Sequence, residues 1–104
     1  MSPPPNIAPS VQLVRPNDGQ RLSDNAPVQL AARATDVDGR ITRVSFFAND
    51  VLVCAATTGS ADGMYSCGWR VTVRRPSKYR LRARATDDRG ANTFSRTITV
   101  TVVP

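Results

Sequence analysis

The sequence predicts an all-β fold, with seven short strands in one antiparallel β-sandwich. Short runs in which apolar and polar residues alternate are separated by clusters of Gly, Pro, Asn and Asp, a pattern typical of strands joined by tight turns. All eight acidic residues are Asp, which favours turns, and none is Glu, which favours helices. The 104 residues leave room for one domain with one core, so the strands must share that core.

The first three predicted strands are 11–15, 28–35 and 41–48, and each ends at a turn signal. The turn sequences are Pro16-Asn17-Asp18-Gly19, Asp36-Val37-Asp38-Gly39 and Asn49-Asp50. Alternation in these strands predicts one buried and one solvated face, as in other antiparallel sheets. The inward face of the third strand is predicted to carry Val44, Phe46 and Ala48.

The other four predicted strands are 51–57, 64–73, 79–86 and 93–102. The strand 79–86 alternates most regularly, because small or apolar residues face inward and Arg faces outward. The last strand is predicted to bury Ile98, Val100 and Val102. Phe94 and Arg96 share the inward phase of that strand, so we expect a β-bulge beside them.

The composition excludes several classes of function. No His is present, which rules out a Ser-His-Asp or Cys-His arrangement within the chain, and two Cys cannot form a four-Cys zinc site. No stretch approaches the roughly 18 apolar residues of a membrane span, so no membrane insertion is expected. The net charge of +6 admits a polyanionic partner, but a solvated basic surface is the favoured interpretation.

Four short motifs follow one another along the chain. They are Asn6-x-Ala8-Pro9-x-Val11-x-Leu13-x-x-Pro16-x-x-Gly19, Ala34-Thr35-Asp36-x-Asp38-Gly39-x-Ile41-x-x-Val44-x-Phe46-x-x-Asn49, Tyr65-Ser66-x-x-Trp69 and Tyr79-x-Leu81-x-Ala83-x-Ala85-Thr86-Asp87-x-x-Gly90-Ala91. Their order resembles the bacterial immunoglobulin-like modules (Big-type, fibronectin-III-like) of multidomain secreted or surface proteins. Such modules commonly sit beside polysaccharide hydrolases and peptidases.

The resemblance implies a seven-stranded antiparallel immunoglobulin-like β-sandwich at 10–103, behind a Pro-rich linker at 1–9. It also implies a bacterial protein that is secreted or displayed on the cell surface. The sequence departs from the family in two ways. The family usually has Gly at the position of Asp50, and the two Cys are not typical of the family. One fold carries many functions, so the resemblance is specific for the fold and not for a role.

Cys54 and Cys67 are predicted to form a disulfide. Cys54 is in phase with Leu52, and Cys67 is in phase with Tyr65 and Trp69, so both thiols face inward. Either a hairpin or strands at facing edges of the two sheets, as in the family topology, would bring them together. The alternative is a pair of buried free thiols, and the family's oxidising compartment favours the disulfide.

Four carboxylates form a candidate calcium site. In an immunoglobulin-like sandwich the loops after the second and sixth strands lie at the same end, which gathers Asp36, Asp38, Asp87 and Asp88. Calcium binds six to eight oxygen ligands, and loop carboxylates supply them. The alternative, which we favour, is that these Asp residues cap tight turns and pair with Arg40 or Arg89, so that no cofactor is required.

Four arginines form a candidate basic binding face. Arg80, Arg82 and Arg84 point outward from one predicted strand, and Arg43 shares their face. Such a face could bind acidic polysaccharide or a cell-wall polymer. Nucleic acid is not expected, because Phe47 is the only exposed aromatic residue predicted beside the arginines and single-strand sites need aromatic stacking. A solvated Arg/Thr face is the favoured alternative.

Tyr65, Trp69 and Tyr79 could line a sugar-binding platform, but their inward phase favours a place in the core. We therefore expect no enzyme in the isolated domain. The favoured function is a non-catalytic accessory or spacer module, whose partners are the neighbouring domains of the same polypeptide. The alternatives are a carbohydrate-binding or anionic-polymer-binding module, or one repeat of a surface adhesin.

Overall fold

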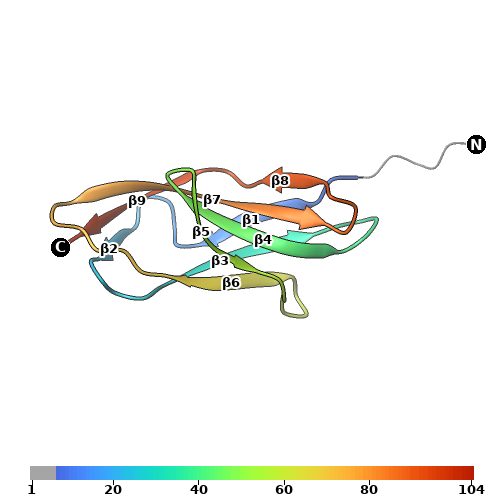
Figure 1. The fold of residues 1–104 in the computed structure, drawn as a ribbon, viewed down its shortest axis with the longest axis horizontal. Helices are drawn as coiled ribbons and strands as arrows, with labels where there is room; N and C mark the ends of the chain where they lie inside the picture. Colours follow the sequence, from blue (N-terminus) through green and yellow to red (C-terminus); the bar gives the residue numbers. More distant parts are fainter. Residues whose placement is uncertain (1–6) are drawn as a thin grey trace, which may run out of the picture.

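Two β-sheets pack face to face in the computed structural model, which describes residues 7–104 (Figure 1). One sheet has the strand order β1-β3-β6. The other has the order β2-β9-β7-β4-β5, with β8 beside β7. The strands of the described residues are β1 (Ser10–Arg15), β2 (Arg21–Ser23), β3 (Val28–Thr35), β4 (Ile41–Ala48), β5 (Val51–Ala56), β6 (Met64–Trp69), β7 (Ser77–Asp87), β8 (Asn92–Phe94) and β9 (Ile98–Val103). The predicted all-β sandwich is confirmed.

The described residues form nine strands where the sequence predicted seven, and two features account for the difference. The short strand β2 pairs in parallel with β9, and Leu22 alone among its residues is buried. The predicted last strand is divided by a β-bulge into β8 and β9. Phe94 pairs with Arg84 of β7 and Ile98 pairs with Leu81. Ile98 is four residues after Phe94, whereas Leu81 is only three residues before Arg84, so the outer strand has one extra residue. The bulge was expected at this position.

The bulge reverses the orientation of Phe94. Because side chains alternate with a period of two, one extra residue moves every side chain beyond it to the opposite face. Ile98 is therefore buried, as predicted, whereas Phe94 lies on the outward face with 43% of its surface exposed. The expected bulge thus accounts for the inward phase that simple alternation gave Phe94.

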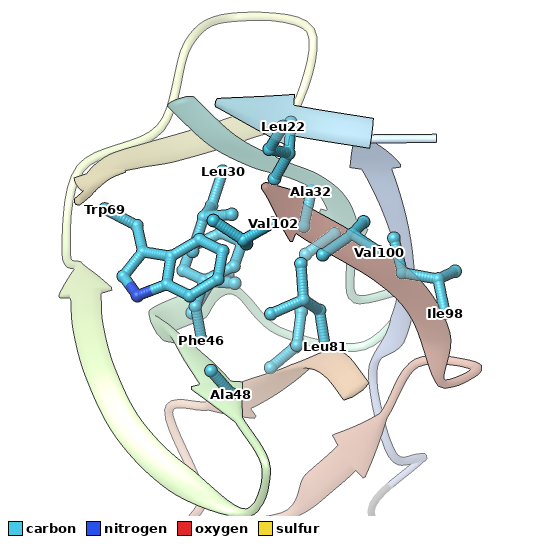
Figure 2. Close-up of a cluster of buried hydrophobic side chains, with 14 residues drawn as sticks. Leu22, Leu30, Ala32, Phe46, Ala48, Trp69, Leu81, Ile98, Val100 and Val102 are labelled. Carbon is cyan, nitrogen blue, oxygen red and sulfur yellow. The ribbon is translucent and has the colours of Figure 1, made fainter. Parts of the chain in front are cut away.

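Large apolar side chains from both sheets fill the space between them (Figure 2). Leu30 from one sheet and Phe46, Leu81 and Val102 from the other belong to this core, and each is at most 1% exposed. Another layer of the core is filled by small buried side chains, which are Ala32, Ala34, Ala83 and Ala85. Small side chains let the two sheets approach closely at that layer.

The strand β6 ends at Trp69, four residues before the predicted end. Beyond it the backbone hydrogen-bonds to the loop after β2 instead of to a neighbouring strand. The N–H of Asn25 donates to the carbonyl of Val71 (2.8 Å), and the N–H of Val73 donates to the Asp24 carboxylate (2.6 Å). Because these hydrogen bonds satisfy backbone groups of Val71 and Val73, the segment does not need to pair with a neighbouring strand.

The described chain enters and leaves the sandwich at opposite ends of its long axis (Figure 1). The entry is held in place because the N–H of Ile7 donates to Asp38 Oδ2 (2.8 Å). Residues 1–6 of the predicted linker lie outside the described residues, so the linker at 1–9 stays a prediction. No helix long and apolar enough to cross a bilayer occurs in the part of the chain that is described.

Candidate functional site

The acidic turns meet at the entry end of the sandwich, between the β3–β4 and β7–β8 loops. Carboxylate oxygens of Asp36, Asp87 and Asp88 lie within 4.8 Å of one another. Asp38 lies outside this trio and beside Asp36. Its carboxylate accepts the N–H of Ile7 and lies 3.8 Å from the guanidinium of Arg89.

All four carboxylates accept a backbone N–H group, and these roles need no metal. Asp87 is buried, and its Oδ1 accepts the N–H groups of Arg89 (2.9 Å) and Ala91 (2.8 Å), which closes the β7–β8 turn. Asp38 anchors the chain at Ile7. Three of the four predicted residues thus come together, and the calcium site stays a prediction.

The pKa values of the neighbouring Asp36 and Asp38 carboxyl groups are shifted in opposite directions. A hydrogen bond with the Asp38 side chain raises the pKa of Asp36, and the loss of hydration around it adds to the effect. The backbone N–H of Ile7 lowers the pKa of Asp38, and the hydrogen bond with Asp36 lowers it further. Asp36 therefore takes up a proton before Asp38 as the pH falls.

Cys54 on β5 and Cys67 on β6 are joined by a disulfide, with their Cα atoms 6.3 Å apart. The two strands do not pair with each other. They are the edge strands of opposite sheets, so the bond joins the sheets along one side of the sandwich. Of the two arrangements considered for these strands, the facing edges are correct and the hairpin is wrong.

The outward face of the larger sheet carries the predicted arginines and two phenylalanines. Phe47 on β4 lies opposite Arg82 on β7, and Arg84 on β7 lies opposite Phe94 on β8. The two rings are 5.9 Å apart between centroids. The carbon at the centre of the Arg82 guanidinium lies 3.9 Å from the centroid of the Phe94 ring, within the range of a cation–π contact.

Phe94 is the residue of this face that sequence reasoning missed, because the bulge alone turns it outward.

Two further residues complete the face. Asp50, in the β4–β5 turn, lies 3.5 Å from the Arg82 guanidinium and 3.9 Å from that of Arg80. Arg43 is exposed on β4 and has no acidic side chain within ion-pair distance among the described residues.

The aromatic residues considered for a sugar platform belong to the core. Trp69 is buried, and Tyr65 and Tyr79 are partly buried against the core cluster. The rings of Trp69 and Tyr79 meet edge to face with centroids 5.4 Å apart, a favoured geometry for packed aromatic pairs. Their place in the core, favoured from the sequence, is confirmed.

Two surface depressions of about 450 and 580 Å³ flank β1, and none of the four predicted arginines lines them. Among the described residues that line them, Asp18 is the one carboxylate. Its Oδ1 accepts the N–H of Thr99 (2.9 Å) and so closes the chain against β9. A pair of carboxylates for acid–base catalysis is not assembled in either depression.

A family model described as a bacterial Ig domain matches residues 9–100 of the chain. Among solved structures, the chain is similar to the fibronectin(III)-like modules of CbhA from Clostridium thermocellum, with 25% identity and a TM-score of 0.72 over 93% of this chain and 46% of that chain. It is also similar to the endo-beta-1,4-mannanase from Thermotoga petrophila, with 15% identity and a TM-score of 0.70 over 93% of this chain and 20% of that chain.

The PKD1 domain of Vibrio anguillarum Epp gives a TM-score of 0.57 at 21% identity, with 96% of this chain and 100% of that chain covered. The likenesses below 25% identity concern the fold alone. The chain spans less than half the length of the CbhA and mannanase structures. No curated protein sequence is significantly similar to it.

Proposed function

The chain belongs to the bacterial Ig domain family, and from that premise we propose that it is a non-catalytic module that spaces and supports neighbouring domains of a secreted or surface-displayed multidomain protein. The observation that carries the proposal is the path of the chain. The described chain begins at one end of an elongated sandwich and reaches its C-terminus at the opposite end (Figure 1). Domains attached at the two ends are held apart by the body of the module.

Two features support a rigid connection. The hydrogen bond from Ile7 to Asp38 fixes the entering chain to the β3–β4 loop. The Cys54–Cys67 disulfide joins the two sheets, and structural disulfides of this kind persist in oxidising compartments, which supports an extracellular location. The similar modules of CbhA and the mannanase structure are parts of longer chains, which supports a role beside other domains.

The absence of catalytic chemistry in the sequence supports an accessory role. The chain has no His, and acid–base catalysis most often uses that side chain. Of the carboxylates gathered at the entry end, Asp87 is buried and already holds a turn. We propose that any enzymatic activity belongs to a neighbouring domain.

The spacer role is tested by fusing a fluorescent protein to each end of the full chain and measuring energy transfer between them. We expect a narrower lifetime distribution than in a fusion with a Gly/Ser linker of the same number of residues, because such a linker is a flexible coil that samples many end-to-end distances. Equal distributions would contradict the proposal. So would hydrolysis of model glycosides by the unfused chain above the buffer background.

A further inference from the structure

The outward face of the larger sheet carries a layer of alternating rings and guanidinium groups. Arg82 stacks on Phe94 at 3.9 Å, and Arg84 lies 5.1 Å from the centroid of the Phe47 ring. Leu52, 56% exposed on the edge strand β5, pairs with Phe47 and extends the layer. We call Phe47, Arg82, Arg84 and Phe94 the arginine–phenylalanine layer.

This layer covers the sheet beneath it. Ser45 is on the outward phase of β4 and pairs with Arg84, yet it is only 1% exposed. The Nε atoms of Arg82 and Arg84 are buried and have no hydrogen-bond partner. Each guanidinium is therefore held against the sheet with its Nε covered. An Nη of Arg82 lies 3.5 Å from the Asp50 carboxylate, and the guanidinium of Arg84 has no acidic partner within ion-pair distance among the described residues.

Fixed guanidinium groups are suited to binding carboxylates. A planar guanidinium can donate two parallel hydrogen bonds to one carboxylate, and stacking on a ring removes much of the side-chain freedom that binding would otherwise restrict. The Arg82 side chain is 33% exposed, so a bound carboxylate would meet a partly desolvated charge. Ion pairs in such positions are stronger than fully exposed ones.

The charge of this face is strongly unbalanced. Arg43, Arg80 and the two arginines of the layer contribute four positive charges, and Asp50 contributes the one negative charge that the structure pairs with them. Arg80, Arg82 and Arg84 follow one another along β7 at intervals of about 6.7 Å, the length of two strand residues. The residues of this face line neither of the depressions described above, so the face suits an extended chain better than a small molecule.

We propose that the arginine–phenylalanine layer binds a carboxylated polysaccharide laid along β7, with carboxylates paired to the terminal nitrogens of Arg82 and Arg84. Single-stranded nucleic acid is a poorer match, because its bases stack on open aromatic faces and these ring faces already hold guanidinium groups. This proposal goes beyond the spacer role and does not depend on it.

The first test measures the affinity of the full chain for soluble polygalacturonate by isothermal titration calorimetry at low salt. The double variant Arg82→Gln/Arg84→Gln is compared with Arg74→Gln/Arg75→Gln, which removes the same charge from the exposed segment between β6 and β7. We expect the first variant to lose about tenfold in affinity, from the loss of charged hydrogen bonds, and the control to lose much less. Equal losses would show attraction by net charge alone and would overturn the proposal.

A second comparison separates geometry from charge. Phe94→Leu keeps the net charge but removes the ring under Arg82, and we expect it to weaken binding. Asp50→Asn removes the competing carboxylate, and we expect it to strengthen binding. Asn suits the left-handed backbone of this position, where φ is 66°. Unchanged affinity in both variants would contradict the proposal.

Two other polymers identify the class of ligand. Hydroxyethylcellulose lacks carboxylates, and we expect no binding to it. Tighter binding of oligodeoxythymidylate than of polygalacturonate would overturn the proposal in favour of nucleic acid. If no polymer binds, the proposed surface is wrong, while the energy-transfer test of the spacer role is unaffected.

Discussion

Ser95 lies in the bulge between β8 and β9, where the N–H of Ala83 on β7 bonds to a side chain instead of to a backbone carbonyl. Its hydroxyl accepts the N–H of Ala83 (2.9 Å) and donates to the carbonyl of Arg96 (2.9 Å). Ser95→Ala would leave a buried N–H without a partner, so we expect a loss of about 1–3 kcal/mol in the free energy of unfolding. Urea denaturation measures it. The control is Thr97→Ala, at an exposed position, and equal stability of the two variants would contradict this role for Ser95.

The trio Asp36, Asp87 and Asp88 makes the calcium prediction testable by thermal unfolding. A cation that binds only the folded chain must raise its melting temperature. If the trio holds calcium, millimolar Ca²⁺ will raise the melting temperature of the wild type more than that of Asp88→Asn, which keeps an acceptor for the N–H of Arg40 but loses the charge. Mg²⁺ should act more weakly because it demands octahedral geometry. No shift with Ca²⁺ would show that the prediction is wrong.

At the scale of elements, the disulfide is the covalent connection between the edge strands β5 and β6. It closes a short loop, since the cysteines are 13 residues apart. In the chain-entropy model such a loop contributes about 3 kcal/mol. We expect dithiothreitol to lower the unfolding free energy of the wild type by about that amount, measured by urea denaturation. The double variant Cys54→Ala/Cys67→Ala should not respond to the reductant, and a comparable response would show that the effect has another origin.

The strands that sequence predicted best are those with a regular two-residue alternation. In β7 the alternation of small residues with arginines placed Leu81, Ala83 and Ala85 in the core and the arginines outside. The strand β2 was missed because three residues with one buried leucine give no recognisable period. Its position depends on parallel pairing with β9, a contact between distant parts of the chain that local pattern does not encode.

The candidate sites show the same limit. The sequence placed the Arg row correctly from strand phase, and it predicted the paired cysteines from strand phase together with the family's oxidising compartment. It could not assign the roles of Asp38 and Asp87, which depend on contacts with Ile7 and with the β7–β8 turn. The exposure of Phe94 could not be predicted from the sequence either. A bulge was expected near it, but the position of the extra residue decides the face that the ring takes.

At the scale of the whole molecule, the N–H of Ile7 donates to the Asp38 carboxylate and so ties the first described residue to the β3–β4 loop. This contact lowers the pKa of Asp38 below its ordinary value of 3.8. A lowered carboxyl pKa stabilises the fold above the unfolded-state pKa, and that contribution is lost as the pH falls through the folded-state pKa. The tether should therefore hold at neutral and mildly acidic pH and open only in stronger acid.

The raised pKa of Asp36 makes this prediction specific, because Asp36 is protonated first and then hydrogen-bonds to Asp38. We expect the Ile7 amide resonance, followed by ¹H–¹⁵N NMR from pH 7 downward, to keep its shift while Asp36 titrates and to move only below about pH 3.8, the ordinary value for Asp38. In Asp38→Asn the side-chain carbonyl can still accept the bond but cannot titrate, so the Ile7 resonance should stay constant. An equally large shift of the Ile7 resonance in Asp38→Asn would mean that another group holds the entering chain.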